Sequence, residues 1–111
     1  MTTRTVTLRD VRDERGTRYL GATMASTGAL TIEGRDYGDG VEQVFGPDHR
    51  EYEWAWTLDS EAVGQLKVAL HSDLEVLDAL AERFSNDAAA GLKSFLDEHG
   101  VGYTAWSRTG E

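Results

Sequence analysis

The amino-acid sequence predicts an α+β domain, in which an antiparallel sheet of four to five strands carries three helices on one face. Apolar and polar residues alternate with a period of two through most of the first 58 residues, as in strands buried on one side. Between positions 60 and 99 the apolar residues recur three and four apart, which indicates amphipathic helices. Alternation returns at 101–107, so an N-terminal meander and a C-terminal strand should enclose a helical segment. A chain of 111 residues fits a single domain over 1–111, with flexible tails at 1–3 and 108–111.

Three strands are expected in the first third of the chain. Residues 4–9 and 17–25 alternate, and the turn-forming residues at 13–16 between them predict a hairpin. Residues 29–34 follow after a Thr-Gly pair and form the third strand. The segment 36–40 (Asp-Tyr-Gly-Asp-Gly) is too rich in glycine for regular structure, so we expect a loop or a bulge there.

The clearest strand is Glu51–Leu58, because its aromatic residues all fall on one side. One face carries Tyr52, Trp54, Trp56 and Leu58, and the other carries Glu51, Glu53, Ala55 and Thr57. A sheet covered by helices on one face should turn the aromatic rings toward those helices. The uncovered face would then present Glu51, Glu53 and Thr57, beside Thr31 and Glu33 of a neighbouring strand. This acidic face is a candidate docking surface.

The second half of the chain should form three helices. Asp59 or Ser60 can cap the first, which runs to about residue 70. Ser72, with Glu75 three positions later, predicts a capping box for the second helix. The third should begin after Ser85 or Asn86 and end at Gly100 in the C′ position. The apolar stripes are Val63, Leu66 and Leu70; Leu74, Leu77, Leu80, Ala81 and Phe84; and Ala88, Leu92, Phe95 and Leu96.

The net charge of −9 restricts the classes of partner. Residues 1–35 hold six Arg against four acidic residues, whereas residues 36–111 hold five basic and 16 acidic residues, a balance of −11. Such a surface repels nucleic-acid phosphates and anionic membranes, so neither is an expected partner. Attraction to a basic protein is the electrostatic interpretation that remains, and simple solubility is its alternative.

Cysteine is absent, and this excludes disulfide scaffolds, zinc–thiolate sites, iron–sulfur clusters and cysteine nucleophiles. The sequence contains no apolar run of about 18 residues, the length that a membrane span requires. No hydrophobic leader follows the N-terminal Met-Thr-Thr-Arg. We therefore expect a soluble, cytoplasmic domain.

Seven polar residues around the middle of the chain are candidates for a binding site. They are Asp36, Asp39, Glu42, Asp48, His49, Glu51 and Glu53. Clustered carboxylates suit hard cations such as Ca²⁺ or Mg²⁺, but the spacing does not match an EF-hand loop, so we expect neither a metal nor a cofactor. His49 beside Asp48 could act as a general base, although a histidine in a loop is usually only a surface residue.

Motifs for nucleophilic catalysis and phosphate binding do not occur: there is no G-x-S-x-G elbow, Walker loop or G-x-G-x-x-G sequence. We therefore assign no catalytic residue. The aromatic residues could line a ligand pocket or simply pack the core; they are Phe45, Tyr52, Trp54, Trp56, Tyr103 and Trp106. Trp and Tyr carry polar atoms that need partners when buried, which favours a rim, an interface or a pocket mouth for some of them.

The segment Gly34–Thr57 resembles a pattern found in small uncharacterised bacterial proteins. The C-terminal stretch Phe95–Val101, with Trp106, is similar to their C-terminal segment. This resemblance covers a little over a third of the chain and implies a stand-alone bacterial domain.

We expect a non-catalytic interaction protein that binds a basic partner through its acidic sheet face or loops, as immunity proteins and antitoxins do. The alternative is a small-molecule binder or small enzyme, with a pocket formed by the aromatic residues and by His49, Asp48 and Glu53. Self-association as a homodimer through the first or last strand is a third hypothesis.

Overall fold

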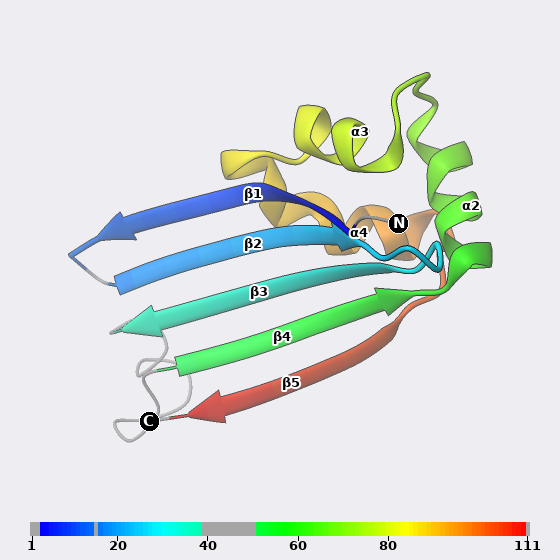
Figure 1. The fold of residues 1–111 in the computed structure, drawn as a ribbon. Coiled ribbons are helices and arrows are strands. Elements are labelled where there is room, and N and C mark those ends of the chain that lie inside the picture. The colour runs from blue at the N-terminus through cyan, green and yellow to red at the C-terminus, as the bar shows by residue number, and fades with distance from the viewer. Residues whose placement is uncertain (1–2, 15, 39–50, 111) are drawn as a thin grey trace.

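The computed structural model describes residues 3–14, 16–38 and 51–110 of the chain. Its sheet is an antiparallel meander with the strand order β1-β2-β3-β4-β5. The strands are β1 (Arg4–Asp13), β2 (Gly16–Met24), β3 (Leu30–Gly38), β4 (Glu51–Leu58) and β5 (Thr104–Gly110). β5 lies beside β4 although the helices separate the two in sequence (Figure 1). The predicted α+β class is confirmed, as is the prediction that a last strand returns to the sheet after the helices.

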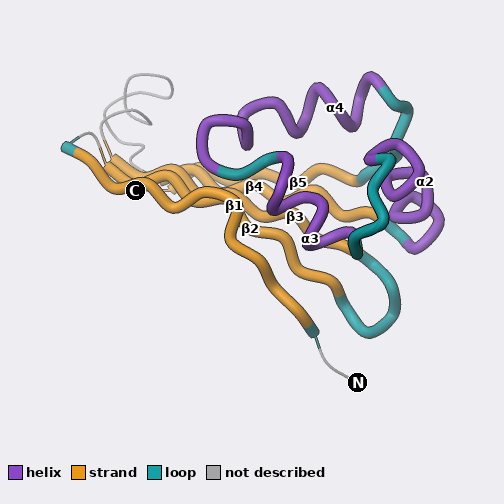
Figure 2. Tube along the Cα trace, turned by 90° about the horizontal axis from the view of Figure 1, so that it is seen from above, coloured by secondary structure: helices purple, strands orange, loops and turns teal. Residues whose placement is uncertain are grey.

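The helical segments follow β4 and lie on one side of the sheet, toward one end of it (Figure 2). They are α2 (Ser60–Leu70), α3 (Val76–Arg83), the 3₁₀ helix η1 (Asn86–Gly91) and α4 (Leu92–Glu98). The third predicted helix is therefore divided, with a 3₁₀ turn over the Ala-Ala-Ala-Gly stretch before α4. α2 is the longest described helix at 11 residues, and in this part of the chain no helix combines the length and apolar character needed to cross a membrane.

Two of the predicted helix ends are confirmed. Asp59 is the N-cap of α2, since its Oδ1 accepts a hydrogen bond from the backbone N–H of Ala62 at 2.8 Å. Gly100 follows α4 with φ +66°, and the N–H of Val101 donates to the carbonyl of Leu96 at 2.9 Å. The N–H of Gly100 itself donates to the carbonyl of Asp97 at 3.3 Å, which completes a Schellman motif.

The predicted capping box at Ser72 is wrong. α3 begins only at Val76, and the Ser72 hydroxyl accepts a hydrogen bond from the N–H of Leu74, which precedes the helix. The Leu74 side chain is 41 % exposed and does not join the apolar stripe, whereas Leu77 and Leu80 are buried. A Ser side chain can satisfy a nearby turn as readily as a helix end, so the sequence pattern did not separate the two.

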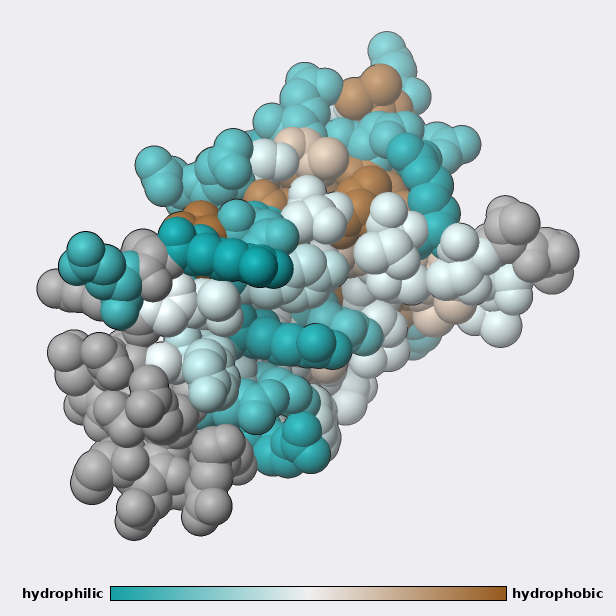
Figure 3. Space-filling view, turned by 60° about the vertical axis from the view of Figure 1, so that its left-hand side comes forward, coloured by the Kyte–Doolittle hydropathy of each residue, from teal (hydrophilic) through white to brown (hydrophobic). Residues whose placement is uncertain are grey.

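Sheet and helices share one core between them. On the sheet side it contains Leu8, Leu20, Ala22, Leu30, Ile32 and Leu58; on the helical side its fully buried members are Leu66, Leu77, Leu80, Leu92 and Leu96. Apolar colour in Figure 3 gathers where the helices meet the sheet, and hydrophilic colour covers much of the surface elsewhere. Among the described residues no polar or charged residue is buried, so apolar contact carries the packing.

The bounds of three strands, β1, β3 and β5, differ from the prediction. β1 continues to Asp13 after a bulge between Thr7 and Arg9. β3 continues to Gly38, so a loop from position 36 is wrong: Asp36 and Tyr37 pair with Tyr52 and Glu51. Cross-strand pairing with β4 thus overrides the local preference of the glycine-rich sequence.

The last strand is shifted toward the C-terminus. β5 starts at Thr104 because Val101 is buried and closes the α4 cap. It extends to Gly110, so residues 108–110 pair with β4 and are not a free tail.

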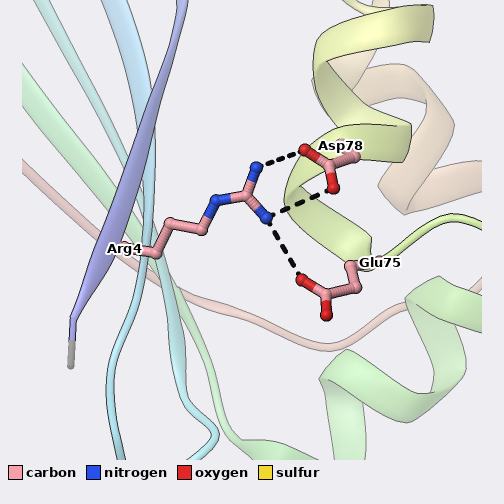
Figure 4. Close-up of polar contacts among 3 residues, drawn as sticks. All are labelled: Arg4, Glu75 and Asp78. Carbon is pink, nitrogen blue, oxygen red and sulfur yellow. Dashed lines mark hydrogen bonds and ion pairs between the residues drawn. The ribbon is translucent and has the colours of Figure 1, made fainter. Parts of the chain in front are cut away.

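Arg4 joins the start of β1 to the start of α3. Its guanidinium donates to both carboxylate oxygens of Asp78 and, at 3.1 Å, to Oε2 of Glu75 (Figure 4). The cationic partner holds the pKa of Asp78 below its ordinary value, chiefly through the hydrogen bond from Arg4. Glu75 and Asp78 are 71 and 74 positions away from Arg4 in the sequence, so these ion pairs depend on tertiary structure alone.

Candidate functional site

The aromatic strand β4 has the predicted orientation. Trp54 and Trp56 pack against the core on the helix-covered face. Tyr52 lies on the same face, with its ring stacked on that of Trp54 at a centroid distance of 5.4 Å. Trp54 lies over Gly34, its register partner in β3, where a side chain would collide with the indole. None of these three side chains is fully buried, so the rings form the border of the core.

The uncovered face of the sheet carries the predicted acidic residues, and on its described part arginines offset most of their charge. Register places Glu53 between Arg35 of β3 and Arg108 of β5, and Arg108 Nη2 donates to Glu53 Oε2 at 2.9 Å. The described charged side chains on this face are Asp10, Glu33, Glu51 and Glu53 against Arg12, Arg35 and Arg108. Their balance is only −1, because arginines from strands distant in sequence lie among the carboxylates, and docking on this face stays a prediction.

Glu51 and Glu53 interact with each other on this face. The hydrogen bond between the two carboxyl groups lowers the pKa of Glu53, and the neighbouring Arg108 and Arg35 lower it further. The same hydrogen bond raises the pKa of Glu51.

The other candidate residues do not join this pair. Asp36 has the same parity in β3 as Ile32 and so lies on the opposite face of the sheet. Burial raises the pKa of Asp36, and Arg9 and Arg18 oppose that shift. Asp39, Glu42, Asp48 and His49, like Phe45, lie outside the described residues. Within the described ranges no three His, Asp or Glu side chains are grouped in a way that could hold a metal ion.

The acidic surplus lies instead on the helical layer. Residues 59–103 carry nine acidic side chains against Lys67, Arg83 and Lys93, a balance of −6. Eight of the nine are exposed and Asp78 is half-buried. Two large apolar side chains are exposed in the same layer, Val68 at 72 % and Leu74 at 41 %. Val68 lies in α2 and Leu74 in the connection from α2 to α3, which also carries Asp73 and Glu75.

A groove of about 400 Å³ lies between α4 and the edge of the sheet formed by β4 and β5. Tyr52, Trp54 and Trp56 of β4, Ala105, Trp106 and Ser107 of β5, and Lys93 of α4 line it. The Lys93 Nζ donates to Asp97 Oδ2 at 2.9 Å, and hydrogen bonding to Asp97 and Tyr103 raises the pKa of Lys93. Three aromatic residues thus form its floor, and Lys93, the cation among the described lining residues, is already paired with Asp97.

Glu53 is absent from the walls of this groove, because it points to the other face of the sheet. Tyr103 lies outside the groove and tilts against Trp56 at 5.8 Å. The part played by Lys93 and Ser107 could not be found from sequence, since neither belongs to a motif and both reach the groove only through the placement of α4 and β5.

Comparison with known proteins finds no family model, no curated protein and no solved structure that matches this chain.

Proposed function

We propose that the chain is a non-catalytic protein-interaction module that binds a basic protein, in the manner of an immunity protein or an antitoxin. The observation that carries this proposal is the surface of the helical layer, which has a balance of −6 over residues 59–103 and exposes two large apolar side chains, Val68 and Leu74. The α2–α3 corner is defined here as residues 67–75 together with Glu82, and it is the docking surface we assign to the partner.

Physical chemistry favours this surface over the open sheet face. A protein interface commonly has a small apolar centre within a polar rim, and exposed Val68 and Leu74 can supply that centre. Asp73 and Glu82 are exposed, and within the described ranges neither forms a hydrogen bond or an ion pair, whereas Glu53 is engaged by Arg108. Unengaged surface carboxylates steer a cationic partner without first breaking an internal ion pair.

A pair of charge-reversal variants tests the proposal. Asp73→Lys with Glu82→Lys changes the net charge by four units at the corner, and Glu33→Lys with Glu51→Lys changes it equally on the open face. A basic protein is first captured from the native host at low salt and purified, and its affinity for the three proteins is measured at two ionic strengths. We expect the corner variant to bind at least about tenfold more weakly, and salt to weaken the wild type, because exposed charges are screened beyond about 10 Å at 0.1 M.

Equal affinity of the corner variant and the wild type would contradict the proposed surface. Failure to capture any basic protein at low salt would contradict the proposed function itself. The open-face variant is the control for the change in net charge, so it should keep most of the wild-type affinity.

One observation favours a second candidate function, the binding of a small planar molecule. The groove of about 400 Å³ has the size of a ligand site and a floor of three aromatic rings. Titration with indole-3-carboxylate, followed by tryptophan fluorescence, tests it: saturable quenching that is lost in Lys93→Met would support an anionic ligand here.

A further inference from the structure

The two edges of the sheet differ in how well they are protected from pairing. Edge strands expose unpaired backbone groups, and proteins commonly block them with bulges, charges or covering elements. β1 has all three: a bulge at Thr7–Arg9, the charged residues Arg4, Arg9, Asp10 and Arg12, and the Arg4 contact with α3. The edge at β1 is therefore a poor template for another strand.

β5, the opposite edge, has little such protection among the described residues. It pairs with β4 without a register shift from Thr104 to Gly110. Its side chains from Thr104 to Arg108 are all exposed, with Trp106 at 53 %, and Arg108 is the one charged residue among them. A regular, exposed strand that carries a large apolar side chain is suited to accept another strand.

We infer that β5 pairs with β5 of a second copy of this chain, so that two sheets join into one antiparallel sheet of ten strands. This inference does not depend on the proposed partner, because the α2–α3 corner lies at the helical layer and not at β5. A contact of this kind uses the same surface on both copies and closes with two-fold symmetry.

Charge supports a second copy as the occupant. Arg108 is already neutralised by Glu53 of its own chain, so two β5 strands approach without like charges facing each other, in spite of the net charge of −9. With the two-fold axis at Ser107, Trp106 lies directly opposite the partner's Arg108. A guanidinium can stack on an indole ring while its edge remains hydrogen-bonded to a carboxylate, so both contacts are compatible.

The second copy would also complete the aromatic groove. Ala105 and Ser107 form its boundary at the sheet edge, and beyond them no described residue lines it. A two-fold axis perpendicular to the joined sheet places the helical layers of both copies on the same face of that sheet. The partner's β5 would then provide the missing wall beside Trp54 and Trp56.

The test compares two exposed aromatic residues on the same face of the sheet. Trp106→Lys places a charge in the proposed interface, whereas Tyr37→Lys changes a side chain of similar exposure, 50 %, on the internal strand β3. Sedimentation equilibrium from about 1 to about 500 µM covers the weak affinities expected of a small interface. We expect a dimer for the wild type and for Tyr37→Lys, and at least about tenfold weaker dimerisation for Trp106→Lys.

Hydrogen exchange of the wild type provides a second measurement that needs no variant. In the dimer, alternate backbone amides of β5 should exchange more slowly at high than at low protein concentration, while β1 amides do not change. A wild type that stays monomeric over the whole range would overturn the inference. So would dimerisation that Trp106→Lys leaves intact, or that both variants abolish equally.

Discussion

Substitution of Gly34 by Ala tests the contact that holds the aromatic border of the core. A Cβ atom at this position would lie 2.0 Å from Cζ2 and 2.1 Å from Cε2 of Trp54. Carbon atoms pack at about 3.5–4.0 Å, so the indole must retreat by about 1.5–2 Å. Gly34 has no positive φ, so steric contact and not backbone strain decides the outcome.

The expected cost follows from two opposing effects. Overpacking of this kind costs about 1–3 kcal/mol. Replacing glycine within a strand recovers about 0.5–1 kcal/mol of chain entropy. The difference centres on a net loss of about 1 kcal/mol and reaches at most about 2.5 kcal/mol, so the Tm of a domain of this size should fall by about 4–8 °C at the central value.

Thermal unfolding followed by circular dichroism measures this effect, with Gly64→Ala as the matched control. Gly64 lies in α2, and a Cβ there would meet nothing within 4 Å. Alanine is favoured over glycine within a helix by about 0.8–1 kcal/mol, so the control should raise the Tm by about 4–8 °C. A Tm of Gly34→Ala equal to or above that of the wild type would show that the indole does not rest on this glycine.

Two further predictions concern the polar contacts of the helical layer. Asp59→Ala removes the N-cap bond to Ala62 and should cost about 1 kcal/mol in urea unfolding, whereas Ser72→Ala, outside any helix, should cost less; equal losses would refute the assignment of the cap. Because Arg4 holds the pKa of Asp78 below its ordinary value of 3.8, this carboxylate stabilises the fold above that pH and loses the effect as the pH falls below it. Asp78→Asn should therefore be less stable than the wild type at neutral pH, with the difference shrinking below about pH 4. A difference that stays constant from pH 7 to pH 3 would show that the ion pair does not act in this way.

Sequence periodicity was sufficient for the parts of this protein that depend on neighbours along the chain. The alternation in β4 correctly separates Trp54 and Trp56 from Glu51 and Glu53, because successive side chains of a strand point to opposite faces. The Asp59 cap and the Gly100 terminus were equally readable, since the groups they satisfy lie within five residues.

Tertiary structure decided what the surfaces are. The periodicity of β4 predicts an acidic open face, but Arg35 and Arg108 reach Glu53 through strand pairing and offset its charge. The continuation of β3 beyond Asp36 likewise required a partner strand to overcome a glycine-rich sequence.

The net charge of the chain was determined by its composition, but the location of that charge was not. The sheet brings opposite charges of distant strands into register, and the short helices present most of their carboxylates to solvent. Electrostatic attraction acts over a few ångströms of space, irrespective of separation along the chain, so only the folded arrangement assigns the acidic surface to the helical layer.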